Sequence, residues 1–169
     1  MASFASLQRA LERADVEYAV IGAHAVNAWI EPRFTADFDI TVQADAAALQ
    51  RLTDELAKEG YTATAQGSEL PSGPDFVRFS AEDDSISLEV QVAKTEFQRQ
   101  AIARASKPDE LRVATVEDLI VMKLIANRPK DRADLAGLIT MPEIDWKYVE
   151  HWAGEWDVVD RLRAIRAAG

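Results

Sequence analysis

The chain contains no cysteine and only two histidines among its 169 residues. Without cysteine, disulfide bonds, thiolate metal ligands and cysteine nucleophiles are all excluded. The two histidines, His24 and His151, are not spaced to form a metal cluster. This composition suits a reducing compartment, and we expect the protein in the cytoplasm.

Long apolar runs and an excess of basic charge are also missing. No run approaches the roughly 20 apolar residues that cross a bilayer, so we expect no transmembrane helix, signal peptide or membrane partner. Lysine and arginine number 19 against 29 acidic residues, a formal net charge of -10. This balance argues against broad attraction to nucleic acid, so an RNA partner would need a local basic patch.

What is present is the composition of a folded protein, with 48% apolar and 28% charged residues. The length suits one domain with a substantial core. We therefore expect a single unit over residues 1–169, with a sheet-containing core over about 1–114 and a helical part over about 115–169.

Apolar spacings of three and four residues predict helices, and alternation of apolar and polar residues predicts strands. In the first part these patterns predict helices at 3–15 (capped by Ser3), 23–29 and 45–58, strands at 18–22, 37–42, 61–65, 76–79 and 86–92, and a turn-rich loop at 67–74. In the remainder of the chain the same patterns predict helices at 96–105 and 116–127, a helix after Pro129, and two helices between 145 and 167. The fold class is α+β, a mixed sheet flanked by helices.

Two aspartates, Asp37 and Asp39, occupy alternate positions of one predicted strand. Residues two apart in a strand share a face, with Cα atoms about 6.5–7 Å apart. Such a pair can converge on one ion, and hard carboxylate oxygens suit Mg²⁺ or Mn²⁺. A bare Asp-x-Asp also fits solvent-facing residues of an amphipathic strand.

Two further features favour a site. Glu89 lies between Leu88 and Val90, where a neighbouring strand could bring a third carboxylate to the same face. Gly22 ends a buried strand before a helix, and a glycine there lets phosphate oxygens approach backbone amides. A glycine turn followed by paired carboxylates favours phosphoryl chemistry.

The stretch from Tyr18 to Trp29 and the segment Glu31–Ile40, which contains the two aspartates, strongly resemble minimal nucleotidyltransferases, particularly the AbiEii/AbiGii toxin-type group. The run from Ala114 to Leu135 is similar to that group's helical motif, with Lys123, Asp131 and Asp134 in its lysine and acidic places. The similar segments cover about 17 to 140.

The resemblance implies transfer of a nucleoside monophosphate from an NTP to an unknown acceptor, which could be RNA, a protein or a small molecule. It implies that Asp37, Asp39 and Glu89 are the catalytic and metal-binding residues and that Gly22 and Ala23 cradle the triphosphate. It also implies a toxin or antitoxin partner protein. Mg²⁺ or Mn²⁺ would be the cofactor and the NTP the substrate.

The sequence departs from the family pattern at two positions. Ala23 replaces the usual second glycine or serine and removes a hydroxyl, while Glu89 is longer than the more common aspartate. An alanine still offers its backbone N–H and a glutamate still offers two oxygens. The alternative function is a catalytically weak or inactive binding module, antitoxin-like, on the same fold.

Other residues have both a functional and a structural interpretation. Arg33 and Thr35 could contact phosphate, or form an ordinary ion pair and favour the strand. Lys123 could reach the cleft or extend to solvent. The spacing of Asp131 and Asp134, one helical turn apart with basic neighbours, favours a solvated face with ion pairs.

Aromatic residues are candidates for contact with a nucleotide. His24 follows the glycine turn and could touch the nucleotide. Among the tryptophans, only Trp29 is expected near the site. The other three, Trp146, Trp152 and Trp156, are expected to pack between the C-terminal helices.

Overall fold

Strands concentrate in the first half of the chain and helices in the second, which confirms the predicted α+β class. The computed structural model describes residues 4–67, 69–70, 73–81, 86–108 and 110–168. The elements are α1 (Phe4–Ala14), β1 (Glu17–Ile21), α2 (Gly22–Asn27), β2 (Asp37–Gln43), α3 (Ala46–Lys58), β3 (Tyr61–Gln66), β4 (Glu69–Leu70), β5 (Gly73–Pro74), β6 (Phe76–Ala81), β7 (Ser87–Val92), α4 (Glu96–Arg104), α5 (Val116–Ala126), α6 (Pro129–Leu138), α7 (Trp146–Glu155) and α8 (Val159–Ala168). Within this part of the chain, every helix is too short or too polar to traverse a lipid bilayer.

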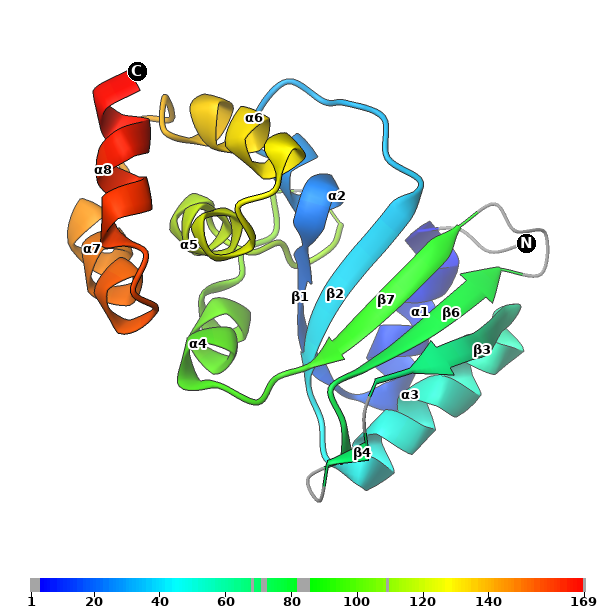
Figure 1. The fold of residues 1–169 in the computed structure, drawn as a ribbon. Helices are drawn as coiled ribbons and strands as arrows, with labels where there is room; N and C mark the ends of the chain where they lie inside the picture. The colour runs from blue at the N-terminus through cyan, green and yellow to red at the C-terminus, as the bar shows by residue number, and fades with distance from the viewer. Residues whose placement is uncertain (1–3, 68, 71–72, 82–85, 109, 169) are drawn as a thin grey trace.

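The described residues form a five-stranded mixed sheet in the order β1–β2–β7–β6–β3 (Figure 1). Strands β2 and β7 run parallel, and the other neighbours run antiparallel. Because a parallel pair needs a long crossover, α3, β3 and β6 lie between β2 and β7 in the sequence. This pairing places Asp39 directly opposite Glu89.

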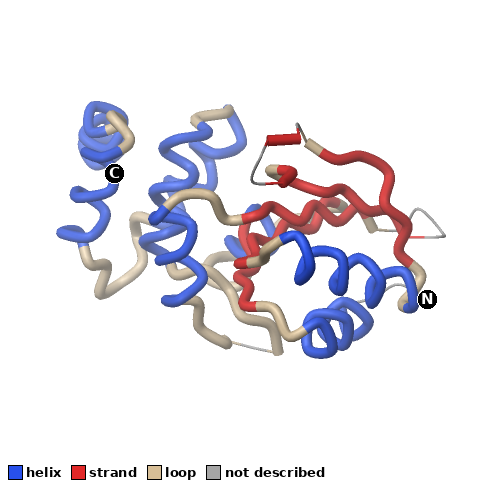
Figure 2. Tube along the Cα trace, turned by 90° about the horizontal axis from the view of Figure 1, so that it is seen from below, coloured by secondary structure: helices blue, strands red, loops and turns tan. Residues whose placement is uncertain are grey.

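The two faces of the sheet have different surroundings. Helices α1 and α3 lie along one face, and the helices from α4 onward gather beyond the β1 edge (Figures 1 and 2). In β2, Phe38, Ile40 and Val42 are buried in the core. Alternation along the strand puts Asp37 and Asp39 on the opposite face, as the sequence predicts.

The turn from α5 to α6 is set by residues with special backbone properties. Asn127 ends α5 in the left-handed conformation with φ of 50°, which asparagine tolerates better than most residues. Pro129 begins α6, where its missing N–H is no loss. The turn brings the first residues of α6 back beside the end of α5.

The predicted elements agree with the structure to within a few residues, with one missed pairing. The turn-rich stretch 67–74 includes the two-residue strands β4 and β5, which pair antiparallel. Strands this short carry no readable alternation, so their sequence showed only turn residues. Helix α2 begins at Gly22 and ends at Asn27, earlier than predicted. The predicted Ser3 cap lies outside the described residues.

A buried carboxylate joins α7 to α5. Asp118 is fully buried, and its oxygens accept hydrogen bonds from Tyr148 Oη at 2.6 Å and Thr115 Oγ1 at 2.8 Å. The Arg104 guanidinium lies 3.9 Å from the centroid of the Tyr148 ring. Burial raises the pKa of Asp118, and these hydrogen bonds oppose that rise. The contact therefore joins α7 to α5 and to the end of α4.

We expect Tyr148→Phe to lower the free energy of unfolding by about 1–3 kcal/mol, because it removes one donor from a buried carboxylate. Urea denaturation measures the effect. In an Asp118→Ala background, which lacks the acceptor, the same change should cost much less, because the two residues share one interaction. Equal costs in both backgrounds would contradict the assignment.

Candidate active site

The three predicted carboxylates lie on neighbouring central strands. Asp39 on β2 pairs with Glu89 on β7 in one direction and with Ile21 on β1 in the other. Asp37 pairs with Ser87, one step along the same face. Asp37 is exposed and Asp39 half-buried. The parallel ladder thus brings together acidic residues far apart in the sequence.

Gly22 is required beside Asp39 for two reasons. Its φ of +69° is a conformation that other L residues rarely adopt. A Cβ added at this position would also lie 2.1 Å from Asp39 Oδ2, well inside contact distance. The glycine turn and the acidic strand are therefore parts of one arrangement, in which the backbone passes directly against the carboxylate.

Asp39 is in an unfavourable place for a negative charge. Burial raises its pKa to about 6, and the nearby charges of Glu89 and Asp37 add to the rise. Lys123 and Lys130 oppose it more weakly. A cation close to Asp39 would relieve this repulsion.

Glu89 already has polar partners. Arg78, its neighbour on β6, donates from Nη2 to Glu89 Oε2 at 2.6 Å. Gln91 Nε2 donates to the other oxygen at 3.2 Å. Arg78 could not be predicted from the sequence, because a cross-strand neighbour on a different strand leaves no local signal.

All eight residues predicted for the site line one cavity of about 370 Å³, called here the polar cavity. The predicted residues are Gly22, Ala23, Arg33, Thr35, Asp37, Asp39, Glu89 and Lys123, and the missed ones are Arg78, Ser87, Arg128 and Lys130. Five basic and three acidic side chains therefore surround this cavity in the described lining. The acidic chain has a local basic surface here.

A buried ion cluster lies behind one wall of the polar cavity, and Lys123 is its member that lines the cavity. Lys123 Nζ donates to Asp134 Oδ2 at 2.7 Å and to Asp131 Oδ1 at 3.1 Å. The three residues are 4%, 3% and 0% exposed, respectively. Burial disfavours ionised Asp131, but hydrogen bonds from Arg128 and Lys123 outweigh it and hold its pKa at about 2.

The prediction that Asp131 and Asp134 lie on a solvated face is wrong. Their spacing shows that the two aspartates share one face of α6. It does not show that α5 packs over that face and buries it. Their contacts are structural, as the sequence analysis favoured, and they also determine where Lys123 points.

Two arginines extend this cluster toward the cavity. Arg33 donates from Nε and Nη2 to the two oxygens of Asp134 at 2.9 and 3.0 Å. The backbone of Arg33 is itself fixed, because Asn27 hydrogen-bonds both its N–H and its C=O at 3.0 and 2.7 Å. Arg128 binds Asp131 at 2.7 and 3.1 Å. Thr35 donates to the Asp37 carbonyl at 3.3 Å.

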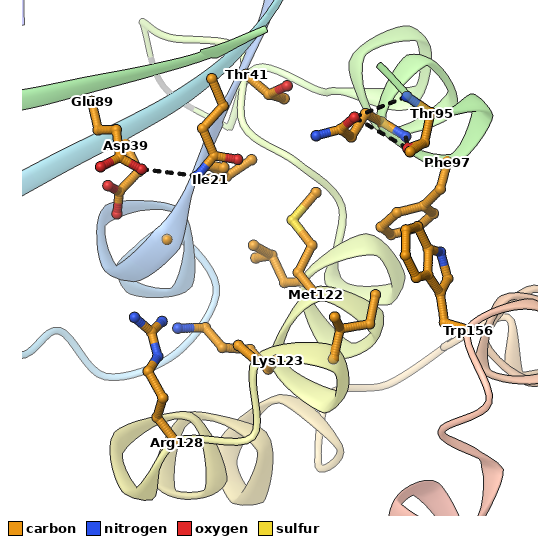
Figure 3. Close-up of a pocket in the computed structure, with 16 residues that line it drawn as sticks. Ile21, Asp39, Thr41, Glu89, Thr95, Phe97, Met122, Lys123, Arg128 and Trp156 are labelled. Carbon is orange, nitrogen blue, oxygen red and sulfur yellow. Dashed lines mark hydrogen bonds between the residues drawn. The ribbon is translucent and has the colours of Figure 1, made fainter. Parts of the chain in front are cut away.

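A second cavity of about 320 Å³ adjoins the first and is called here the apolar groove. The two share Gly22, Asp39, Glu89, Lys123 and Arg128. Figure 3 shows Asp39 and Glu89 on one side of the groove, with Phe97 and Trp156 at the other.

The structure changes the expected places of three aromatic residues. Trp156, expected to pack helices, lines the apolar groove and is 38% exposed. Trp29, expected near the site, donates from Nε1 to the Ala114 carbonyl at 2.9 Å and lines neither cavity. His24 lies against Phe38 with ring centroids 4.7 Å apart, outside both cavities.

The carboxylates of Asp37, Asp39 and Glu89 have the chemistry that a divalent cation requires, and the strand pairing places them on one face. Their side chains do not converge on one point. Within the described ranges, no group of three or more acidic or histidine side chains is close enough together to hold a metal ion as it stands. Asp37 and Asp39 offer hard oxygens, and the raised pKa of Asp39 marks negative charge that a cation would stabilise. Glu89 would exchange Arg78 for the ion.

A family model described as "Nucleotidyltransferase of unknown function (DUF6036)" matches residues 2–164. The chain belongs to this nucleotidyltransferase family. No protein with a curated description matches its sequence. The membership confirms the predicted superfamily.

Solved structures show the same nucleotidyltransferase fold. A putative nucleotidyltransferase from Helicobacter pylori has a TM-score of 0.55 and 16% identity, covering 97% of this chain and 78% of its own. The antibiotic-resistance factor ANT(2'')-Ia has a TM-score of 0.52 and 17% identity, with 97% and 87% covered. An antigenic nucleotidyltransferase-like protein from Paracoccidioides brasiliensis has a TM-score of 0.53 and 16% identity, with 95% and 89% covered.

We expect Asp39→Asn to raise the free energy of unfolding by about 2 kcal/mol at pH 8, measured with a chelator present to remove divalent cations. The folded carboxyl has a higher pKa than the unfolded one, so its ionisation destabilises the fold as pH rises from about 4 to above 6. The gain should therefore vanish near pH 4. Urea denaturation across this range tests it, with exposed Asp54→Asn as the control.

We expect Gly22→Ala to lower the free energy of unfolding by about 2–4 kcal/mol, through both the strained backbone and the clash with Asp39. Gly73→Ala is the matched control, because Gly73 has φ of +86° but nothing within 4 Å of an added Cβ. That control should cost only about 1–2 kcal/mol. Equal losses in thermal or urea unfolding would show that the clash is relieved at no cost.

Proposed function

We propose that this chain transfers a nucleoside monophosphate from an NTP to an acceptor hydroxyl and releases pyrophosphate, using Mg²⁺ or Mn²⁺. The observation that carries the proposal is the pairing of Asp39 with Glu89 beside Gly22, at the rim of a basic cavity. The family and the fold support it. The acceptor in this proposal is an RNA, a protein or a small molecule.

The polar cavity suits the triphosphate. Arg33, Arg78, Lys123, Arg128 and Lys130 line it and offer the charge that phosphate oxygens require. Two buried aspartates hold Lys123 in place, so little reorganisation is needed when negative charge arrives. Gly22 and Ala23 line the same space and let the chain approach the phosphates closely.

In the proposed reaction, the acceptor oxygen attacks the α-phosphorus and the bond from that phosphorus to the bridging oxygen of the pyrophosphate breaks. Pyrophosphate leaves with the electron pair, toward the basic side chains of the polar cavity. Glu89 takes the acceptor proton. Bound Mg²⁺ or Mn²⁺, held by Asp37, Asp39 and Glu89, would neutralise phosphate charge and make the acceptor oxygen more nucleophilic.

The proposal includes a place in a toxin–antitoxin system, with an antitoxin or toxin partner protein. Its support is the sequence resemblance to the AbiEii/AbiGii toxin-type group. A fold neighbour, ANT(2'')-Ia, has been solved in complex with adenylyl-2''-tobramycin, so that protein binds an adenylylated small molecule.

One observation favours the second candidate, a nucleotide-binding module without transfer activity. Both Glu89 oxygens accept hydrogen bonds, from Arg78 and Gln91, so the third carboxylate is occupied within the protein. In that case nucleotide would bind, and no pyrophosphate would be released with any acceptor.

The test is calorimetry of the purified protein with Mg²⁺ and each NTP, followed by pyrophosphate release with RNA, protein and small-molecule acceptors. We expect one NTP to bind only with metal, and the double variant Asp37→Ala, Asp39→Ala to lose binding by about a hundredfold. Circular dichroism checks that the variant is folded. Binding without release in any acceptor pool would select the second candidate. No binding at all would reject both and leave the antitoxin-like interaction module on the same fold.

A further inference from the structure

The apolar groove has a lining with no charge of its own. Apart from the residues that it shares with the polar cavity, none of its described lining residues is charged. Phe97, Leu119, Met122 and Trp156 provide apolar surface (Figure 3). The groove therefore suits an uncharged, flat group that is joined to a charged group in the polar cavity.

One hydroxyl in this groove has no partner. Thr41 lies two residues after Asp39 on β2, lines the groove and is 1% exposed. Its Oγ1 is buried and makes no hydrogen bond within the described part of the chain. Burying an unpaired hydroxyl costs free energy, and valine would fill the same shape without that cost. A polar atom of a ligand would satisfy Thr41.

We propose that the apolar groove holds the nucleobase of the NTP and that Thr41 is the residue that hydrogen-bonds to it and sets base preference. This inference rests on the proposed function. Because the two cavities share Asp39, Glu89, Lys123 and Arg128, one molecule can extend across both. An NTP has the matching shape, a charged tail joined to an uncharged ring.

The same lining argues against the acceptor as the occupant. A polycationic or polyanionic acceptor would lose its hydration in the groove without gaining a charged partner beyond the shared residues.

Two probes separate the base from the phosphates. With Mg²⁺, each NTP tests both cavities, whereas inorganic tripolyphosphate tests the polar cavity alone. We expect calorimetry of the unaltered protein to show at least tenfold tighter binding of the preferred NTP than of tripolyphosphate. We expect Thr41→Val to weaken that NTP about fivefold to tenfold, to leave tripolyphosphate unchanged and to raise the melting temperature.

Thr62→Val is the matched control, because Thr62 is exposed on the far strand β3. It should change neither affinity. The base assignment is overturned if the unaltered protein binds NTP and tripolyphosphate equally, if Thr41→Val weakens both ligands alike, or if it leaves the affinities of all four NTPs unchanged. A raised acceptor KM with unchanged NTP affinity would assign the groove to the acceptor. If neither probe binds, the proposed function itself fails.

Discussion

The buried contact of Lys123 with Asp131 and Asp134 determines the arrangement of the cavity wall. It joins α5 to α6, and through Asp134 it also holds Arg33 from the loop before β2. Removing one partner from such a cluster leaves an uncompensated buried charge, which costs about 3–5 kcal/mol. The wall opposite the carboxylates is therefore rigid, and its positive charges stay where the fold places them.

The polar cavity and the apolar groove contain two local features that selection for stability alone would not retain. Asp39 is held where its charge is repelled, and the Thr41 hydroxyl is buried without a partner. Both lie on the same face of β2, two residues apart. Among the other buried polar groups of the described structure, Asp118 has well-formed hydrogen bonds, whereas Arg104 Nε makes no hydrogen bond but lies 3.5 Å from Asp118 Oδ2. Two unfavourable polar groups on one strand face are typical of a ligand-binding site.

The sequence predicted the elements with strong periodicity, and strand alternation and the glycine turn gave Asp37, Asp39, Glu89 and Gly22 as local signals. The family resemblance added Lys123, and all eight candidate residues line one cavity. The sequence missed Arg78 and Arg128, whose proximity depends on strand order and on a helix turn. It also misjudged Asp131 and Asp134, since spacing along a helix does not say what covers a face. Thr41 gave no signal, because a threonine in a strand is ordinary.

The parallel pairing of β2 with β7 has a consequence for how the protein is made. Asp37 and Asp39 are synthesised early, but the crossover through α3, β3 and β6 must be complete before Glu89 can join them. Non-local pairing of this kind is a slow step in folding. Lys123 and its aspartates follow later still along the chain. A nascent chain therefore carries its acidic pair well before it has a polar cavity, and that cavity is complete only when α6 has been synthesised and packed.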